Sequence, residues 1–246
     1  MAQPVMVIFG ASGGIGSALA RTLAAAGAVV ALASRKLEVI EPLAESLGGR
    51  AWRADGTQSA DVNRVLAAAQ GELGRVDGVA NCIGSLLLKP AHLTTEEEWA
   101  DVLRVNLTSA FLIVRAAAKS MMSTGGGSIA LVSSVAAQLG LANHEAIAAA
   151  KAGIIGLVRA AGASYAAKNI RINAVAPGLT RTPLTDRITS HEASLKATLA
   201  MHPLGRIGTP EDVATALAFL LAPSQGWITG QVLGVDGGLG CLRPRG

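Results

Sequence analysis

Apolar residues occur along the chain in two kinds of segment that alternate from end to end. Short, almost unbroken apolar runs such as Val5–Phe9 and Val29–Ala33 are typical of strands that are buried on both faces. Longer segments, many of them rich in Ala and Leu, lie between the runs and predict helices. Strands that alternate with helices are expected to join through right-handed crossovers. The pattern therefore predicts a doubly wound α/β fold, a mostly parallel sheet with helices on both faces.

The order of the elements follows from the same pattern. Strands are predicted at Val5–Phe9, Val29–Ala33, Ala51–Ala54, Gly78–Ala80, Ser128–Val132, Arg171–Val175 and Val232–Val235. Helices are predicted at Gly14–Ala26, Leu37–Leu47, Ala60–Leu73, Glu96–Met122, Asn143–Ala167 and Pro210–Leu221. No linker and no internal repeat interrupts the 246 residues, so we expect residues 1–246 to form a single domain.

A glycine-rich turn stands between the first strand and the first helix. The residues of interest in it are Gly10, Ser12, Gly14, Ile15 and Gly16. Glycines let the backbone approach a ligand, and the helix N-terminus that follows offers free N–H groups and a positive dipole end. Such a turn forms a cradle for a pyrophosphate and predicts a dinucleotide-binding Rossmann fold, with the ligand beyond the carboxyl ends of the strands. A purely structural turn is the alternative.

The end of the second strand indicates which dinucleotide is bound. An acidic residue there would bind the adenosine ribose hydroxyls and repel a 2′-phosphate. This chain has Ser34 at the expected acidic position and Arg35 directly after it, and a guanidinium suits a phosphate. We therefore expect NADP, with NAD less favoured. A solvated loop arginine is the alternative role for Arg35.

Composition narrows the classes of partner. Hydrophobic residues make up 50% of the chain and charged residues only 15%, so association with further copies is expected to bury the excess apolar surface. The net charge is +4, but basic residues are scattered and aromatic residues are 3%, which argues against nucleic acid as a partner. The two cysteines, Cys82 and Cys241, form no disulfide framework, and no charge-free apolar run reaches about 18 residues. We expect a cytoplasmic protein that does not enter a membrane.

Several stretches, together with the glycine turn, resemble the short-chain dehydrogenase/reductase family over nearly the whole chain. They are Asn81-Cys82-Ile83-Gly84, Lys151-Ala152-Gly153, Pro177-Gly178 with Thr182, and Val235-Asp236-Gly237-Gly238. The resemblance implies an oxidoreductase that uses NADP, without a metal, on a small-molecule carbonyl or alcohol. It also implies a homotetramer whose main two-fold interface uses the helices Glu96–Met122 and Asn143–Ala167.

The same resemblance implies the contacts with the cofactor. The residues that match are Asn81, Gly84, Pro177, Gly178 and Thr182, the last three at the nicotinamide. Asp55 would contact the adenine, although an aspartate that caps the next helix is an equal alternative. Cys82 stands where the family usually has Asn, and we expect this thiol to be buried and unreactive. The segment Leu184–Met201 would cover the substrate, whose identity it does not reveal.

The active-site segment matches the family in all but one residue. The family uses a serine followed by Tyr-x-x-x-Lys, in which tyrosine transfers the alcohol proton, lysine lowers the tyrosine pKa and serine orients the carbonyl. Ser134 and Lys151 match, but the tyrosine position is occupied by Ile147. Tyr165, the only tyrosine of the chain, lies eighteen residues further along the same predicted helix, about 27 Å away. It cannot take over the role.

Two hypotheses follow from the missing tyrosine. In the first, His144 replaces it, because it precedes Lys151 by seven residues on one helix face, beside an expected N-cap at Asn143 that favours neutral imidazole. A first-turn surface histidine is the alternative. In the second, the protein binds a dinucleotide without reductase chemistry, as a sensor, scaffold or inactive partner subunit. Asn106 favours the first, because a matching Asn in relatives holds a water in a proton relay to the lysine; a surface Asn is the alternative.

Overall fold

The computed structural model describes residues 3–243, and within them a seven-stranded sheet forms the centre of the molecule. The strands are β1 Val5–Phe9, β2 Val29–Ser34, β3 Arg50–Arg53, β4 Gly78–Asn81, β5 Gly127–Val132, β6 Ile170–Pro177 and β7 Val232–Val235. Their order in the sheet is β3-β2-β1-β4-β5-β6-β7, and each neighbouring pair is parallel. The predicted doubly wound α/β fold of Rossmann type is confirmed.

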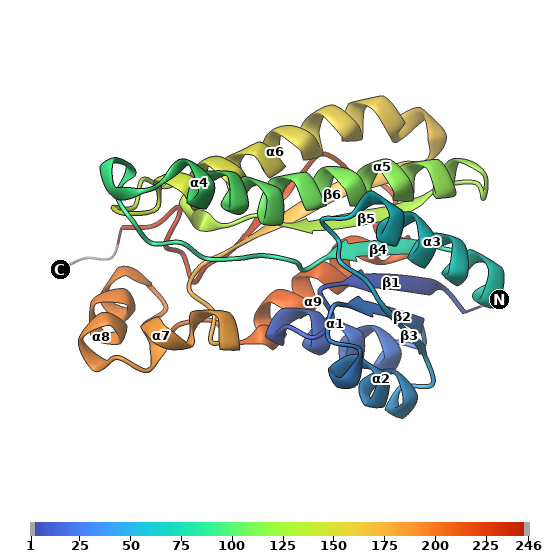
Figure 1. Ribbon diagram of the computed structural model, residues 1–246, viewed down its shortest axis with the longest axis horizontal. Coiled ribbons are helices and arrows are strands. Elements are labelled where there is room, and N and C mark those ends of the chain that lie inside the picture. The colour runs from blue at the N-terminus through green and yellow to red at the C-terminus, as the bar shows by residue number, and fades with distance from the viewer. Residues whose placement is uncertain (1–2, 244–246) are drawn as a thin grey trace.

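The winding reverses at β1. From β1 the chain proceeds outward through β2 to β3, and then returns to β4 on the other side of β1. Such a reversal leaves a crevice beyond the carboxyl ends of the two strands, where open α/β sheets bind ligands. The short helix α7 (Asp186–Thr189) and α8 (Glu192–Met201) project from the body of the molecule at this end of the sheet (Figure 1).

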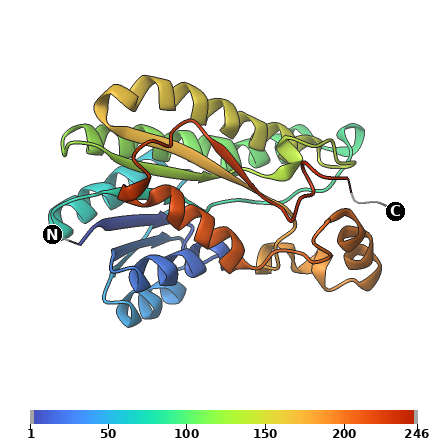
Figure 2. The same cartoon turned by 180° about the vertical axis from the view of Figure 1, so that it is seen from behind.

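Helices cover both faces of the sheet (Figures 1 and 2). On one face lie α1 Gly14–Ala25, α2 Leu37–Ser46 and α9 Pro210–Leu221; on the other lie α3 Ser59–Leu73, α5 Ser109–Met122 and α6 Glu145–Tyr165. Alternate residues of each strand serve the two faces: in β1, Val7 packs with α3 and α5, whereas Ile8 packs with α1 and α9. Both kinds of residue must be apolar, which explains the unbroken apolar runs in the sequence.

The predicted helix Glu96–Met122 is continuous but not regular. Its first part is α4 Glu96–Leu103, and a π-helical turn, Arg104–Thr108, joins it to α5. Asn106 lies in this turn and is fully buried, so the alternative of a surface Asn is wrong. Its side-chain amide donates to the Val102 carbonyl (3.0 Å). A single π turn inside a helix often marks a functional site.

The start of α6 corrects a detail of the prediction. The N-cap is His144 and the helix begins at Glu145, whereas Asn143 has a φ of 63°. Asn is one of the few residues that adopts this left-handed conformation readily, so it closes a turn before the helix instead of capping it. His144 is therefore the N-cap residue and not a member of the first turn.

One helical segment among the described residues, Glu145–Lys168, is long and apolar enough to cross a membrane by length and composition. Its side chains Ile154, Val158 and Ala161 belong to the core cluster between the sheet and the helices α3, α5 and α6. A core helix of this kind passes the same test as a membrane span, so its apolar character is explained by packing.

Candidate active site

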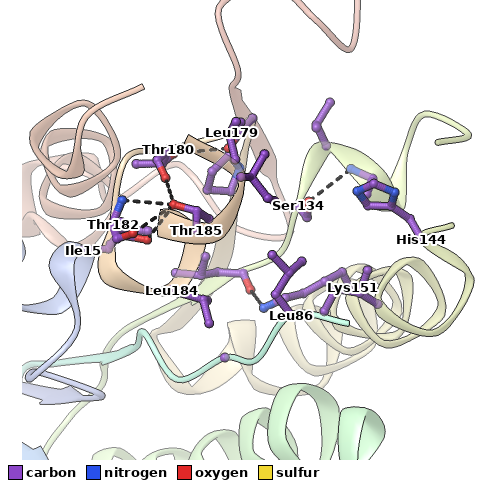
Figure 3. A pocket seen from close by; sticks show the side chains of 18 of the residues that line it. Ile15, Leu86, Ser134, His144, Lys151, Leu179, Thr180, Thr182, Leu184 and Thr185 are labelled. Carbon is purple, nitrogen blue, oxygen red and sulfur yellow. Dashed lines mark hydrogen bonds between the residues drawn. The ribbon is translucent and has the colours of Figure 1, made fainter. Parts of the chain in front are cut away.

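A cavity of about 560 Å³ lies beyond the carboxyl ends of β1, β4, β5 and β6 (Figure 3). The predicted site residues that line it are Gly14, Ile15, Gly84, Ser134, His144, Lys151, Pro177, Gly178 and Thr182. The predicted residues that lie outside its wall are Gly10, Ser12, Gly16, Ser34, Arg35, Asp55, Asn81 and Asn106. Between residues 3 and 243, no group of three or more His, Cys, Asp or Glu side chains could hold a metal ion.

The glycines of the first turn are required by close packing. Gly10 has a φ of +78°, and a Cβ there would lie 2.7 Å from the Cys82 backbone carbon. A Cβ at Gly14 would lie 3.0 Å from the Thr182 side chain, and one at Gly16 would collide with the Gly10 carbonyl. The turn thus brings β1, the start of α1 and the segment after β6 together. It leaves the N-terminus of α1 open to the cavity.

The end of β2 carries the groups expected to select the dinucleotide. The Ser12 and Ser34 hydroxyls are hydrogen-bonded to each other (2.7 Å), and Ser34 also accepts from the Lys36 amide (3.2 Å). Arg35 is exposed and has no ion pair within residues 3–243, so its guanidinium is available to a ligand.

Asp55 does not cap the next helix. Its carboxylate accepts from the Thr57 amide (2.9 Å) and hydroxyl (2.8 Å), which closes a tight turn before α3. The N-cap of α3 is Gln58, without a side-chain cap. The capping alternative for Asp55 is therefore wrong, and its contact with adenine stays a prediction. Asn81 likewise bonds locally, accepting from the Ile83 amide (3.0 Å).

Lys151 is the cation of the cavity. Its Nζ donates to the Val132 carbonyl (2.8 Å) at the end of β5, and burial away from water lowers the pKa of the ammonium to about 8. The neighbouring Cys82 is partly exposed, not fully buried as expected, but burial of its sulfur raises the pKa of the thiol to about 12. Cys82 therefore stays protonated and unreactive, as predicted.

Asn106 connects the π turn to the wall of the cavity. Its amide donates to the Ser85 hydroxyl (2.9 Å), and its side-chain oxygen accepts from the Ser85 amide (3.2 Å). A Cβ at Gly84 would lie 3.3 Å from the same oxygen and 3.7 Å from the Lys151 Nζ. Asn106 thus fixes the segment after β4 beside the lysine. Sequence reasoning missed Ser85, because nothing in the sequence links it to Asn106.

The serine and the isoleucine of the active-site segment occupy different surroundings. Ser134 follows β5 and lines the cavity, where its Oγ accepts from the Ala136 amide (3.2 Å) and keeps its own proton to donate. Ile147 is 4% exposed and packs in an apolar cluster with Val102 and Ala150. The position of the missing phenol is therefore an apolar part of the cavity wall.

His144 points its ring toward the cavity from the start of α6 (Figure 3). Its Nδ1 lies 2.8 Å from the Ala142 carbonyl. A carbonyl can only accept, so Nδ1 carries the proton and the Nε2 of a neutral His144 has a free lone pair. In the neutral state the ring can accept a proton through Nε2, but it cannot donate one there.

His202 is a residue of the site that sequence reasoning missed, although it directly precedes the recognised stretch Pro203–Arg206. It is buried, its Nδ1 donates to the Thr198 carbonyl (2.8 Å), and its Nε2 has no partner in the part of the chain that the structure describes. A Cβ at Gly178 would lie 2.8 Å from this nitrogen. Buried polar atoms are normally hydrogen-bonded, so this nitrogen is an exception, and it is closed off from the cavity.

Comparisons with known proteins agree with the geometry. Residues 10–240 match a family model described as enoyl-(acyl carrier protein) reductase. The chain is 39% identical to a cis-4-hydroxycyclohexanecarboxylate dehydrogenase of Sinomonas cyclohexanicum and 36% identical to the 3-oxoacyl-(acyl-carrier-protein) reductase FabG of Vibrio cholerae, each time over 96% of both chains. It is 37% identical to the inactive 2-(S)-hydroxypropyl-CoM dehydrogenase 2 of Xanthobacter autotrophicus, over 90% of this chain and 99% of the relative.

Solved structures give the same result. A short-chain type dehydrogenase/reductase from Mycobacterium ulcerans superposes with a TM-score of 0.93 at 31% identity, covering 98% of this chain and 91% of the other. A tyrosine-to-phenylalanine variant of ElxO with NADPH bound superposes with a TM-score of 0.90 at 29% identity, covering 97% and 99%.

Proposed function

The chain belongs to the short-chain dehydrogenase/reductase family, a family of oxidoreductases, and from that premise we propose that it uses NADP to interconvert a small-molecule carbonyl compound and its alcohol with an altered acid/base. The observation that carries the proposal is that Ser134 and Lys151 face the same cavity as the glycine turn. The cytoplasmic location expected from the sequence is part of the same proposal.

The residues around the cavity fit a dinucleotide. The turn Gly10–Gly16 would hold the pyrophosphate at the N-terminus of α1, where Gly13, Gly14 and Ile15 line the cavity. Arg35 would hold the 2′-phosphate, Lys151 the ribose, and Pro177–Thr182 the nicotinamide. When bound, NADP supplies or accepts a hydride. Relatives named as bound to NADPH or NADP support this choice of cofactor.

The chain's own groups supply the remaining chemistry. The Ser134 hydroxyl has a proton to donate to the carbonyl oxygen of the substrate. The Lys151 ammonium places a positive charge beside it, at a point where water is largely excluded. His144 would take the alcohol proton at Nε2 in the direction of oxidation. In the direction of reduction it must first be protonated.

A second candidate function is a dinucleotide-binding protein without redox turnover. The observation that favours it is the apolar side chain of Ile147 at the position of the proton donor. One relative is itself named as inactive. A positioned acid or base contributes roughly 10²- to 10⁴-fold to a rate, so its loss alone would leave only slow turnover.

Titration and turnover separate the two functions. NADPH binding is measured by fluorescence, and oxidation of bound NADPH by ketones is followed by absorbance. Binding with ketone-dependent oxidation supports the enzyme, and binding without oxidation by the native chain or by the variants discussed below supports the second function. Failure to bind NADPH would contradict both.

Arg35→Ala is expected to reduce the preference for NADPH over NADH by about 10- to 150-fold. A charge-assisted bond to phosphate contributes about 1.5–3 kcal/mol, and each 1.36 kcal/mol is a factor of ten. Dissociation constants of both cofactors are compared by fluorescence titration. Arg159→Ala is the control. Arg159 is exposed on α6, which lies on the other face of the sheet from α2, and its loss should leave the ratio of the two dissociation constants unchanged. Equal affinity of the native chain for both cofactors would contradict the assignment.

We also propose a homotetramer, for which light scattering should give four times the chain mass of 24.8 kDa. Large exposed side chains support it: Trp99 and Phe111 lie on α4 and α5, and Phe219 lies on α9. Ala117 and Ala161, on the two helices that the resemblance places at the interface, are buried in the subunit's own core and are not available to it. A mass near 24.8 kDa would contradict the proposal.

A further inference from the structure

Building on the proposed function, we propose that the substrate is an uncharged and largely apolar ketone or secondary alcohol. Two independent features of the cavity carry this inference: a wall with few charged groups, and exposed apolar side chains from three separate segments.

Apart from His144, which the proposed function assigns to the reacting oxygen, the wall offers no charged partner that is free for an anionic substrate. Lys151 is the only Lys, Arg, Asp or Glu among the described residues that line the cavity. Its Nζ already donates to the Val132 carbonyl, and the proposed function assigns its remaining hydrogen-bonding capacity to the cofactor. The N-terminus of α1 is assigned to the pyrophosphate of the cofactor, and burial of a substrate carboxylate or phosphate without a partner costs several kcal/mol, so an anionic substrate is disfavoured.

Several large apolar side chains of the wall are exposed, although serine, threonine and histidine side chains also line the cavity. Leu88, Leu184 and Met201 are 41%, 52% and 41% exposed and come from three separate segments. Figure 3 shows Leu184 and Leu86 on the same side of the cavity as Lys151. Exposed apolar side chains that converge on one cavity are explained by a ligand that covers them.

A series of methyl ketones tests the apolar character of the substrate. From 2-butanone to 2-octanone, kcat/KM with NADPH is expected to rise about threefold to fourfold per added methylene, the equivalent of about 0.8 kcal/mol each. Calorimetry of the matching 2-alkanols with the purified protein should show the dissociation constant falling by the same factor per added methylene. This second readout does not depend on turnover.

An ester and the matching carboxylate test whether the cavity disfavours a negatively charged substrate. Methyl 6-oxoheptanoate should be preferred at least tenfold over 6-oxoheptanoate, both in kcat/KM and in binding. Met201→Lys should raise the ratio of kcat/KM for the carboxylate to kcat/KM for the ester by up to about fivefold, the range of an exposed ion pair. Met122→Lys is the control, because Met122 is 47% exposed on α5 and lies outside the cavity.

The outcomes distinguish a failure of the proposed substrate class from a failure of the proposed reaction. Binding that increases with chain length and favours the ester supports the substrate class even if no ketone is reduced, in which case only the proposed reaction fails. A carboxylate that binds as well as its ester, a series without a chain-length increment, or no measurable binding of any neutral ligand would each overturn the substrate class.

Discussion

Ile147→Tyr is expected to raise the reduction of a simple ketone by about 10²- to 10⁴-fold, the contribution of a positioned general acid. Position 147 lies one helical turn before Lys151 on α6, and both residues line the cavity. A phenol there would lie beside an ammonium, which lowers a phenol pKa, and near the Ser134 hydroxyl. Turnover with NADPH and a methyl ketone gives the measurement.

Ile147→Phe distinguishes the effect of the phenol proton from the effect of an aromatic ring at position 147. Ile147 packs against Val102 and Ala150, so any aromatic ring must turn partly into the cavity. The phenylalanine variant makes the same steric demand without the hydroxyl and should gain nothing. Equal rates for the two variants, with NADPH bound by both, would contradict a site that is intact apart from the tyrosine.

His144→Ala is expected to lower the oxidation of a secondary alcohol by 10²-fold or more if His144 is the acid/base. Neutral His144 has its proton on Nδ1, held by the Ala142 carbonyl, so Nε2 is ready to accept the alcohol proton. The loss should appear in both directions, because reduction returns the same proton through the same nitrogen. Initial rates of alcohol oxidation and of ketone reduction give the measurement.

A second histidine provides the control for this variant. His92 lies in an exposed short helical turn, Ala91–Leu93, outside the cavity, and His92→Ala should leave both rates unchanged. If His144→Ala matches that control, His144 is a surface N-cap residue. If Ile147→Tyr is inactive as well, the chain binds a dinucleotide without redox turnover.

The fold could be predicted because its signals are local. Strands such as β1 and β2, which are buried on both faces, leave unbroken apolar runs, and a glycine turn follows the first of them. The details that could not be predicted depend on single side chains in a folded context. Asn143 looks like a helix cap by residue type, but its left-handed backbone makes it part of a turn. The π turn around Asn106 depends on contacts with Ser85, 21 residues earlier in the chain.

The residues of the site also fall into those that the sequence predicts and those that it does not. Ser134, Lys151 and Gly14 could be placed in one cavity because each follows the carboxyl end of a parallel strand or lies on the helix beside it. The segment Leu184–Met201 is expected over the substrate, and its two end residues do line the cavity. Leu88 could not be predicted there, because it meets them only in three dimensions. His202 carries no distinguishing sequence signal, since its importance rests on a hydrogen bond that it does not make.

The π turn also affects how the chain aligns with other sequences. A π turn accommodates an extra residue locally, so α4 packs against α6 while α5 keeps its buried face toward the sheet on the other side of Arg104–Thr108. A relative with a regular helix would align only with a one-residue gap at this point. Without that gap, Asn106 would be paired with the wrong neighbour, and the residue that fixes the wall beside Lys151 would be overlooked.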